Sequence, residues 1–306
     1  MEDLKAPASA PRRPWLSVLL YLLAACGLAA LALFGYAYWQ HKQEAKQPPA
    51  RVTIDDTAVI ESVMTSNFGK YSANRKGWLY VDDNNRTYVM RVIQQAKVTD
   101  AADGDELYFL ASGTGTIDDD VAVIYGVFHI RPTRPYDGGL TEVSQPVIPA
   151  SSAPIKPEHV HFEALSDKLW GWVVKVADGN TPLGERSITR NVIWTARENE
   201  IAKLGEFIAA ADHDPGVPCD EARKAYDDWQ VLAETDQGAA ENIGPQRCEK
   251  QRWTYRTGTV NGNIPVPITV TAGGTLDGQP VEAKKWKLMF DTKSFSYNVP
   301  EELQSW

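Results

Sequence analysis

The hydrophobic and polar positions divide the chain into one long apolar stretch near its N-terminus and a longer region of mixed character. Residues 15–39 contain no Asp, Glu, Lys, Arg or His. At about 1.5 Å per residue, a helix of this length reaches roughly 37 Å, enough to cross a ~30 Å hydrocarbon core with some tilt. Trp15 and Trp39 at its ends are typical of rings at headgroup level. The pattern predicts a transmembrane helix.

The lengths of the flanking segments predict the orientation of this anchor. Basic residues are nearly balanced on its two sides, so their distribution alone does not decide. A tail of residues 1–14 remains easily in the cytoplasm, whereas a long folded region translocates largely regardless of charge. We expect a single-pass protein of the inner membrane. Its N-terminus would be cytoplasmic, residues 40–52 would form a juxtamembrane linker, and a periplasmic body would follow.

Two alternatives to an uncleaved anchor remain open. Residues 23–26 read Leu-Ala-Ala-Cys, which is typical of a lipoprotein signal in which Cys26 is lipidated. A cleaved signal peptide has an apolar core of only about 7–15 residues. The apolar run continues beyond Cys26 to Trp39, and this favours the anchor. Small residues four apart, such as Ala25 and Ala29, also permit association with another helix in the bilayer.

The next periodic pattern predicts an α+β module over residues 53–131. Asp55 or Asp56 can cap a helix, apolar residues follow at helical spacing, and Gly69 ends it. Four β-type segments then predict an antiparallel meander. The run at 121–130 is apolar on both faces, which indicates a central strand covered on both sides.

The remainder of the chain predicts a second β-rich module. Residues 131–158 contain six prolines, which exclude a regular helix and disfavour a paired central strand. We expect a linker over 132–158, with a long extended crossing within one domain as the alternative. Residues 159–306 combine several strands with one helix at 220–233. A weakly favoured strand at 200–209 would form a hairpin around Glu198. The fold class expected is therefore α+β, predominantly antiparallel β.

Charge and cysteine content restrict the partners and the compartment. The chain carries −9, and residues 1–14 contain two acidic and three basic side chains, so the remainder carries −10. This acidic body argues against nucleic acid as a partner. Cys219 and Cys248 are the only cysteines after Cys26, and an oxidising compartment would pair them. Closing a loop of about 30 residues would stabilise the fold by roughly 3.5 kcal/mol.

Two groups of residues are candidate metal ligands. Carboxylates around a tight turn could bind Ca²⁺, and helix capping is the competing interpretation. This group comprises Asp212, Asp214, Asp220 and Glu221. His159 and His161, two apart in a predicted strand, would face one side and could hold a metal with ligands from elsewhere. An exposed or locally hydrogen-bonded pair is the simpler reading.

The aromatic residues and the absence of enzyme motifs bear on function. Trp170, Trp172 and Trp194 could form a platform for sugars, although Trp170 and Trp172 also belong to a period-two stripe that is typical of a core strand. The sequence has no nucleophile elbow, His-Glu-x-x-His motif or P-loop, so we do not expect an enzyme. The sequence favours a membrane-anchored scaffold or assembly protein that contacts other envelope proteins. The alternatives are a module that binds glycans or small ligands and a carboxylate-dependent hydrolase.

Overall fold

The computed structural model describes residues 14–44, 51–99, 101, 103–117, 120–134, 138–150, 153–177, 186–235, 245 and 247–304. The chain divides into two units, Met1–Ala50 and Arg51–Trp306. Nearly all of the predicted tail lies outside the described residues. Residues 51–306 form one compact unit, and both β-rich segments predicted from the sequence lie within it.

The first unit contains helix α1, Pro14–Glu44, which confirms the predicted apolar helix. The window Tyr21–Gln40 is long and apolar enough to cross a membrane, and none of it is buried inside the unit. A signal sequence near an N-terminus has the same length and composition. The helix is therefore a candidate membrane span.

Helix α2, Asp56–Phe68, begins and ends as the sequence predicts. The Asp55 carboxylate accepts a hydrogen bond from the Ala58 N–H at 3.2 Å, satisfying one of the free donors of the first turn. At the other end, Gly69 has φ 85° and its N–H donates to the Thr65 carbonyl. One face of the helix is buried: Ile60, Val63, Met64 and Phe68.

The first sheet has six antiparallel strands in the order of the sequence. It extends the predicted four-stranded meander by a short strand before it and a strand after it. Its strands are β1 (Tyr71–Ser72), β2 (Gly77–Val81), β3 (Thr87–Val98), β4 (Glu106–Ile117), β5 (Asp120–Pro132) and β6 (Leu140–Pro149).

Strand β6 lies within the segment that we expected to be a linker. It pairs with β5 at the edge of the sheet, where proline is tolerated because one side of the strand needs no partner. The pairing shifts register between Tyr125 and Val127, and Pro146 lies there, beside Gly126. An edge position and a bulge thus accommodate prolines that would be excluded from a central strand.

The second sheet contains nine antiparallel strands, with helix α3, Cys219–Thr235, between β10 and β11. The predicted hairpin around Glu198 is confirmed, and Glu198 has φ 51°. Asp277 and Gly278 have φ values of 51° and 73°, as a tight hairpin turn requires. The strands are β7 (Val160–Ser166), β8 (Leu169–Ala177), β9 (Arg186–Arg197), β10 (Glu200–His213), β11 (Glu249–Thr257), β12 (Ile268–Leu276), β13 (Gln279–Pro280), β14 (Lys285–Asp291) and β15 (Ser296–Asn298).

The second sheet curves around a core of its own. Strands β7 and β11 are four places apart in the strand order, yet the Tyr255 hydroxyl on β11 donates to Glu163 on β7 at 3.1 Å. The Val266 N–H also donates to the Leu165 carbonyl at 2.7 Å. Side chains such as Phe207 and Leu288 fill the enclosed space and are fully buried. Two short 3₁₀ turns, η1 (Pro157–His159) and η3 (Glu301–Leu303), complete the described elements of this unit.

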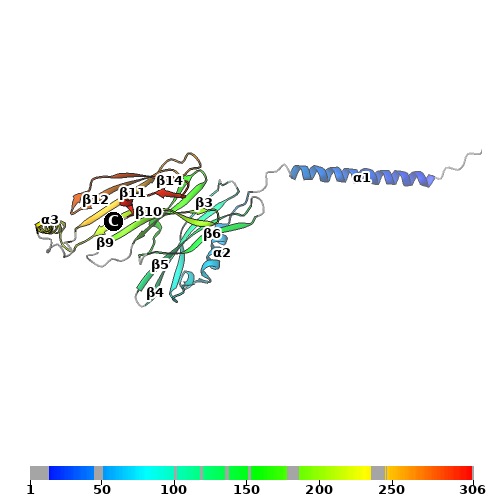
Figure 1. The fold of residues 1–306 in the computed structure, drawn as a ribbon. Coiled ribbons are helices and arrows are strands. Elements are labelled where there is room, and N and C mark those ends of the chain that lie inside the picture. Colours follow the sequence, from blue (N-terminus) through cyan, green and yellow to red (C-terminus); the bar gives the residue numbers. More distant parts are fainter. Residues whose placement is uncertain are drawn as a thin grey trace, which may run out of the picture. The chain divides into compact units, whose positions relative to one another are not determined.

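The first sheet is covered on both faces, as predicted for its central strand. Helix α2 lies beside the first sheet (Figure 1). Alternate residues of β4 and β5, such as Phe109 and Phe128, pack with α2 on that side. The residues between them, such as Leu110 and Val127, pack against β7–β9 of the second sheet. The compact unit is thus layered as helix, first sheet and second sheet.

The disulfide predicted between Cys219 and Cys248 is present. It joins the start of α3 to the residue before β11 and closes the separation of 29 residues expected from the sequence. The Asp277 carboxylate accepts from the Cys248 N–H at 3.1 Å, and the Arg247 side chain pairs with the same carboxylate. The base of α3 is therefore held by covalent and polar contacts together.

Truncating Phe128 should destabilise the compact unit strongly. The ring is fully buried, stacks on Phe109 with centroids 4.5 Å apart and meets Phe68 edge-on at 6.0 Å. We expect Phe128→Ala to lower the free energy of unfolding by about 3–5 kcal/mol in chemical denaturation of the full chain. Leu232→Ala, on a half-exposed side chain of α3, should change it by less than about 0.5 kcal/mol. Similar losses for the two variants would contradict the assignment of this core.

Protein isolated from cells should carry the disulfide already formed. Alkylation under denaturing, non-reducing conditions should modify only Cys26, the one free cysteine of the chain. Reduction before alkylation should add two further labels, on Cys219 and Cys248, and intact-mass spectrometry would count them. Three labels without reduction would show that the unit resides in a reducing compartment.

Candidate functional site

A hollow in the compact unit lies between α2 and the neighbouring strands of the first sheet. Its volume, about 580 Å³, is within the range of ligand and peptide sites. We call it the α2 groove. It is lined by Thr57, Ile60 and Glu61 of α2, by Tyr71, Lys76 and Trp78, and by Arg91, Val92 and Gln95 of β3.

Two aromatic rings form one side of the α2 groove. Tyr71 of β1 and Trp78 of β2 are paired across the strands, and their rings meet edge-on with centroids 4.9 Å apart. The Trp78 indole N–H donates to the Thr65 hydroxyl of α2 at 3.2 Å, which fixes the orientation of its ring. Tyr71 remains 46% exposed. The groove thus presents aromatic surface that its own fold does not cover completely.

Two cations lie at the β1–β2 end of the groove. Lys76 occupies the turn before β2 with φ 52°, and Arg91 of β3 braces this turn. The Arg91 guanidinium donates to the carbonyls of Lys76 at 3.0 Å and Arg75 at 2.7 Å. Among the lining residues, only Glu61 carries negative charge. The groove is therefore locally cationic on a chain that is acidic overall.

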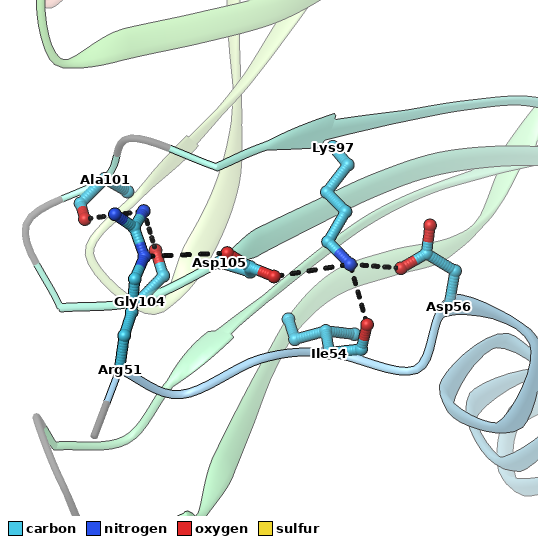
Figure 2. A network of polar contacts seen from close by, with 7 residues as sticks. All are labelled: Arg51, Ile54, Asp56, Lys97, Ala101, Gly104 and Asp105. Carbon is cyan, nitrogen blue, oxygen red and sulfur yellow. Dashed lines mark hydrogen bonds and ion pairs between the residues drawn. The ribbon is translucent and has the colours of Figure 1, made fainter.

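A polar network holds the start of α2 against β3 and so fixes the wall of the groove (Figure 2). The Lys97 ammonium of β3 donates to the Asp56 carboxylate at 2.9 Å and to the Ile54 carbonyl at 2.7 Å. It also lies 3.3 Å from the Asp105 carboxylate. The hydrogen bond to Asp56 is the main cause that raises the pKa of Lys97. Lys97 therefore remains charged and keeps α2 in place at neutral pH.

The same network secures the segment that leads into α2. Figure 2 shows Arg51 reaching toward Asp105, with the Arg51 Nε 3.6 Å from its carboxylate. The Arg51 guanidinium also donates to the carbonyls of Ala101 and Gly104 at 3.3 and 3.4 Å. A backbone hydrogen bond runs from the Asp105 N–H to the Val52 carbonyl at 2.9 Å. The entry of the chain into this unit is thus tied directly to the first sheet.

The tryptophans proposed as a sugar platform lie between the two sheets. Trp172 is 1% exposed and Trp194 is 8% exposed, and the partly buried Trp170 packs in the same cluster. The Trp194 indole N–H donates to the Tyr125 hydroxyl at 3.1 Å, joining the second sheet to the first. Burial, the main cause, raises the pKa of Tyr125 to about 12, so its hydroxyl stays protonated. The period-two stripe packs as core at Trp172, and neither Trp172 nor Trp194 presents a ring face to a sugar in solution.

The acidic residues proposed as Ca²⁺ ligands have other partners in the structure. Asp212 pairs with Arg252 at 2.7 Å, and Asp214 accepts from the Gly216 N–H at 2.9 Å. Asp220 and Glu221 lie in the first turn of α3, where negative charge is favourable. The turn and the start of α3 are neighbours in the chain, but their carboxylates do not form a group that could hold a metal ion.

The two candidate histidines do not share a strand. His159 ends the turn η1, and its Nδ1 accepts from the Lys156 N–H at 3.4 Å. Burial is the main cause that lowers the pKa of His159. His161 lies on β7, with its ring 6.5 Å from that of Tyr255. Within the described parts of the chain, no group of three or more His, Cys, Asp or Glu side chains could hold a metal ion.

The residues of the α2 groove were not among the candidate site residues predicted from the sequence. A signal was nevertheless present, because residues 70–91 contain five basic and two acidic side chains within an acidic chain. That excess of basic residues predicts a cationic surface, but it does not predict a groove. The groove also requires Ile60 and Glu61 from α2, whose approach to β3 is decided by tertiary packing.

A second depression contains tryptophans but is less suited to a ligand. It has a volume of about 400 Å³, and Trp253, Trp286 and Glu302 are among its lining residues. The Lys284 ammonium lies 5.1 Å from the centroid of the Trp286 ring, and the Trp286 N–H donates to Glu302. The ring face that would stack on a ligand is thus engaged by a cation of the same chain.

Comparison of the chain with protein-family models, with curated proteins and with solved structures finds no match.

A partly buried carboxylate near the sheet interface, that of Glu106, should make stability depend on pH. Burial alone raises the pKa of Glu106, but hydrogen bonds from His129 at 3.0 Å and Tyr108 at 2.6 Å together lower it below its usual range. A lowered folded-state pKa stabilises the fold above the unfolded-state pKa, and this stabilisation is lost as pH falls through the folded-state pKa.

We therefore expect Glu106→Gln to cost about 1–3 kcal/mol at pH 7, with the difference from wild type shrinking below about pH 4. Chemical denaturation at a series of pH values would measure this. Glu200→Gln, on an exposed side chain, is the matched control and should show no such pH-dependent difference. A difference that stays constant down to low pH would rule out an ionised Glu106 as its origin.

Proposed function

We propose that this chain is a membrane-anchored, extracytoplasmic scaffold that holds a partner protein of the cell envelope in its α2 groove. The observation that carries the proposal is the groove itself, an open, aromatic and cationic hollow on an otherwise compact unit. Its aromatic rings, its apolar floor and its cations are the groups that bind protein segments.

Two further features support the proposed compartment. Helix α1 is apolar over a span that suits a bilayer, and the Cys219–Cys248 disulfide suits an oxidising environment. Together they support a topology with the N-terminus in the cytoplasm and residues 51–306 on the far side of the membrane. In this topology α1 confines the groove to the membrane surface, which raises the effective concentration of a partner in the same membrane.

The burial of the candidate tryptophans and the partners of the buried acids favour a scaffold over the two alternative functions. A glycan-binding module would need exposed, aligned rings, whereas Trp172 and Trp194 are core residues. A hydrolase would need acidic groups free to exchange protons with a substrate. The buried carboxylates of Glu249 and Asp277 and the partly buried one of Glu106 are instead each bonded to a basic side chain of the fold.

Site-specific photo-cross-linking in intact membranes tests the proposal. p-Benzoylphenylalanine at Tyr71, 46% exposed in the groove, should give a discrete adduct with a partner protein. The same probe at Met289, 49% exposed on β14 of the second sheet, is a control of matched exposure and should not give that adduct. Absence of an adduct at Tyr71, or the same adduct from both positions, would argue against the groove as the partner site.

A further inference from the structure

We infer that the α2 groove recognises an extended protein segment in which an acidic side chain lies within a few residues of a large apolar one. This inference rests on the proposed function and names the chemistry of the partner. Three properties of the groove support it: its apolar floor, its cations and its length along β3.

The floor of the groove suits a large apolar side chain. Ile60 of α2 and Val92 of β3 line it, next to the edge-on rings of Tyr71 and Trp78. Ile60 and Val92 also belong to the core cluster beneath, so the floor is backed by packed side chains and is held in shape. Covering such a surface with a Leu or Phe side chain removes apolar area from water on both partners.

The cations of the groove lack an acidic partner among the described residues. The ion pairs between side chains of the described residues join other basic residues to carboxylates, and none of them includes Lys76 or Arg91. The Arg91 guanidinium is held by the carbonyls of Arg75 and Lys76, and these neutral groups do not neutralise its charge. The two hydrogen bonds place this guanidinium beside the turn that carries Lys76. A carboxylate from a partner would complement both cations at once.

The remaining polar groups give the bound segment a direction. Arg91 and Gln95 line the groove four residues apart on β3, a separation of at most about 13 Å because the strand is irregular between Val92 and Gln94. This length matches about four residues of an extended peptide. Thr57 and Gln95 offer groups that can bond to its backbone, and Glu61 disfavours a second acidic residue at the α2 end. The acidic side chain would therefore lie toward Lys76 and the apolar one over Ile60 and Val92.

An anionic membrane surface is the competing partner for these cations, and the observations favour a protein segment. The chain after residue 14 carries −10, which opposes close approach of this unit to anionic lipid. A bilayer surface would also engage protruding residues, whereas Ile60 and Val92 lie in the floor of a hollow. The groove thus fits a chain that can enter it.

Selection from a random peptide library tests the inference with the full chain held in nanodiscs of phosphatidylcholine. Peptides enriched by the wild-type protein should carry Asp or Glu within about three residues of Leu, Phe or Trp. Lys76→Glu should weaken binding of these peptides about five- to tenfold in fluorescence anisotropy, because it removes an attraction and adds a repulsion. Lys293→Glu changes the net charge equally on an exposed turn of the second sheet and should leave the affinity unchanged.

The inference is overturned if the enriched peptides show no acidic excess, or if Lys76→Glu binds them as well as the wild type does. Binding to phosphatidylglycerol vesicles that depends on Lys76, without peptide enrichment, would also overturn it and assign the cations to lipid. These results are distinguishable from failure of the proposed function. An adduct from the probe at Tyr71 that persists in Lys76→Glu would support the scaffold proposal and reject the acidic segment. Absence of that adduct with Lys76 intact would reject the scaffold proposal itself.

Discussion

Burial of the first sheet on both faces is the constraint on which the rest of the compact unit depends. Strands β4 and β5 send alternate side chains to opposite sides, so Phe109 packs under α2 while Leu110 packs against the second sheet. An antiparallel sheet commonly leaves one face in water. Here both faces of the central strands β4 and β5 are covered, because a helix packs on one face and a curved second sheet packs on the other.

This double burial imposes a cost on every polar group near the interface, and the structure satisfies several of those groups locally, although the buried Trp172 Nε1 and His129 Nδ1 have no hydrogen-bond partner among the described residues. Tyr108 faces the second sheet, and its hydroxyl donates to Glu106, which also contacts His129. Tyr125 accepts from Trp194 across the two sheets. Because buried polar groups without partners are costly, these hydrogen bonds allow a largely apolar interface to contain polar residues and also fix its register.

The groove follows from the incomplete cover that α2 provides. The 13 residues of the helix extend only about 20 Å, whereas strands β3 and β5 of the sheet beneath it, with 12 and 13 residues, extend about 40 Å. Lys97 holds the start of the helix close to β3, and Gly69 turns the chain back into β1 at its end. Between these two fixed points, the side of the helix that faces β2 and β3 leaves the hollow bounded by Tyr71 and Trp78. A short, firmly held helix therefore produces both a stable core and an open site.

The sequence by itself determined those features that depend on local spacing and chain chemistry. These include the apolar helix, the caps of α2, the doubly buried strand at 121–130, the hairpin turns and the cysteine pair, since each is encoded by residues close in sequence or by elimination among few candidates. Tertiary structure alone decided that β6 joins the first sheet, that the tryptophans lie between the sheets, and that Glu61 and Arg91 line one groove. Those outcomes depend on which faces meet across long separations, and the periodicity of a segment indicates that a face is apolar without indicating what covers it.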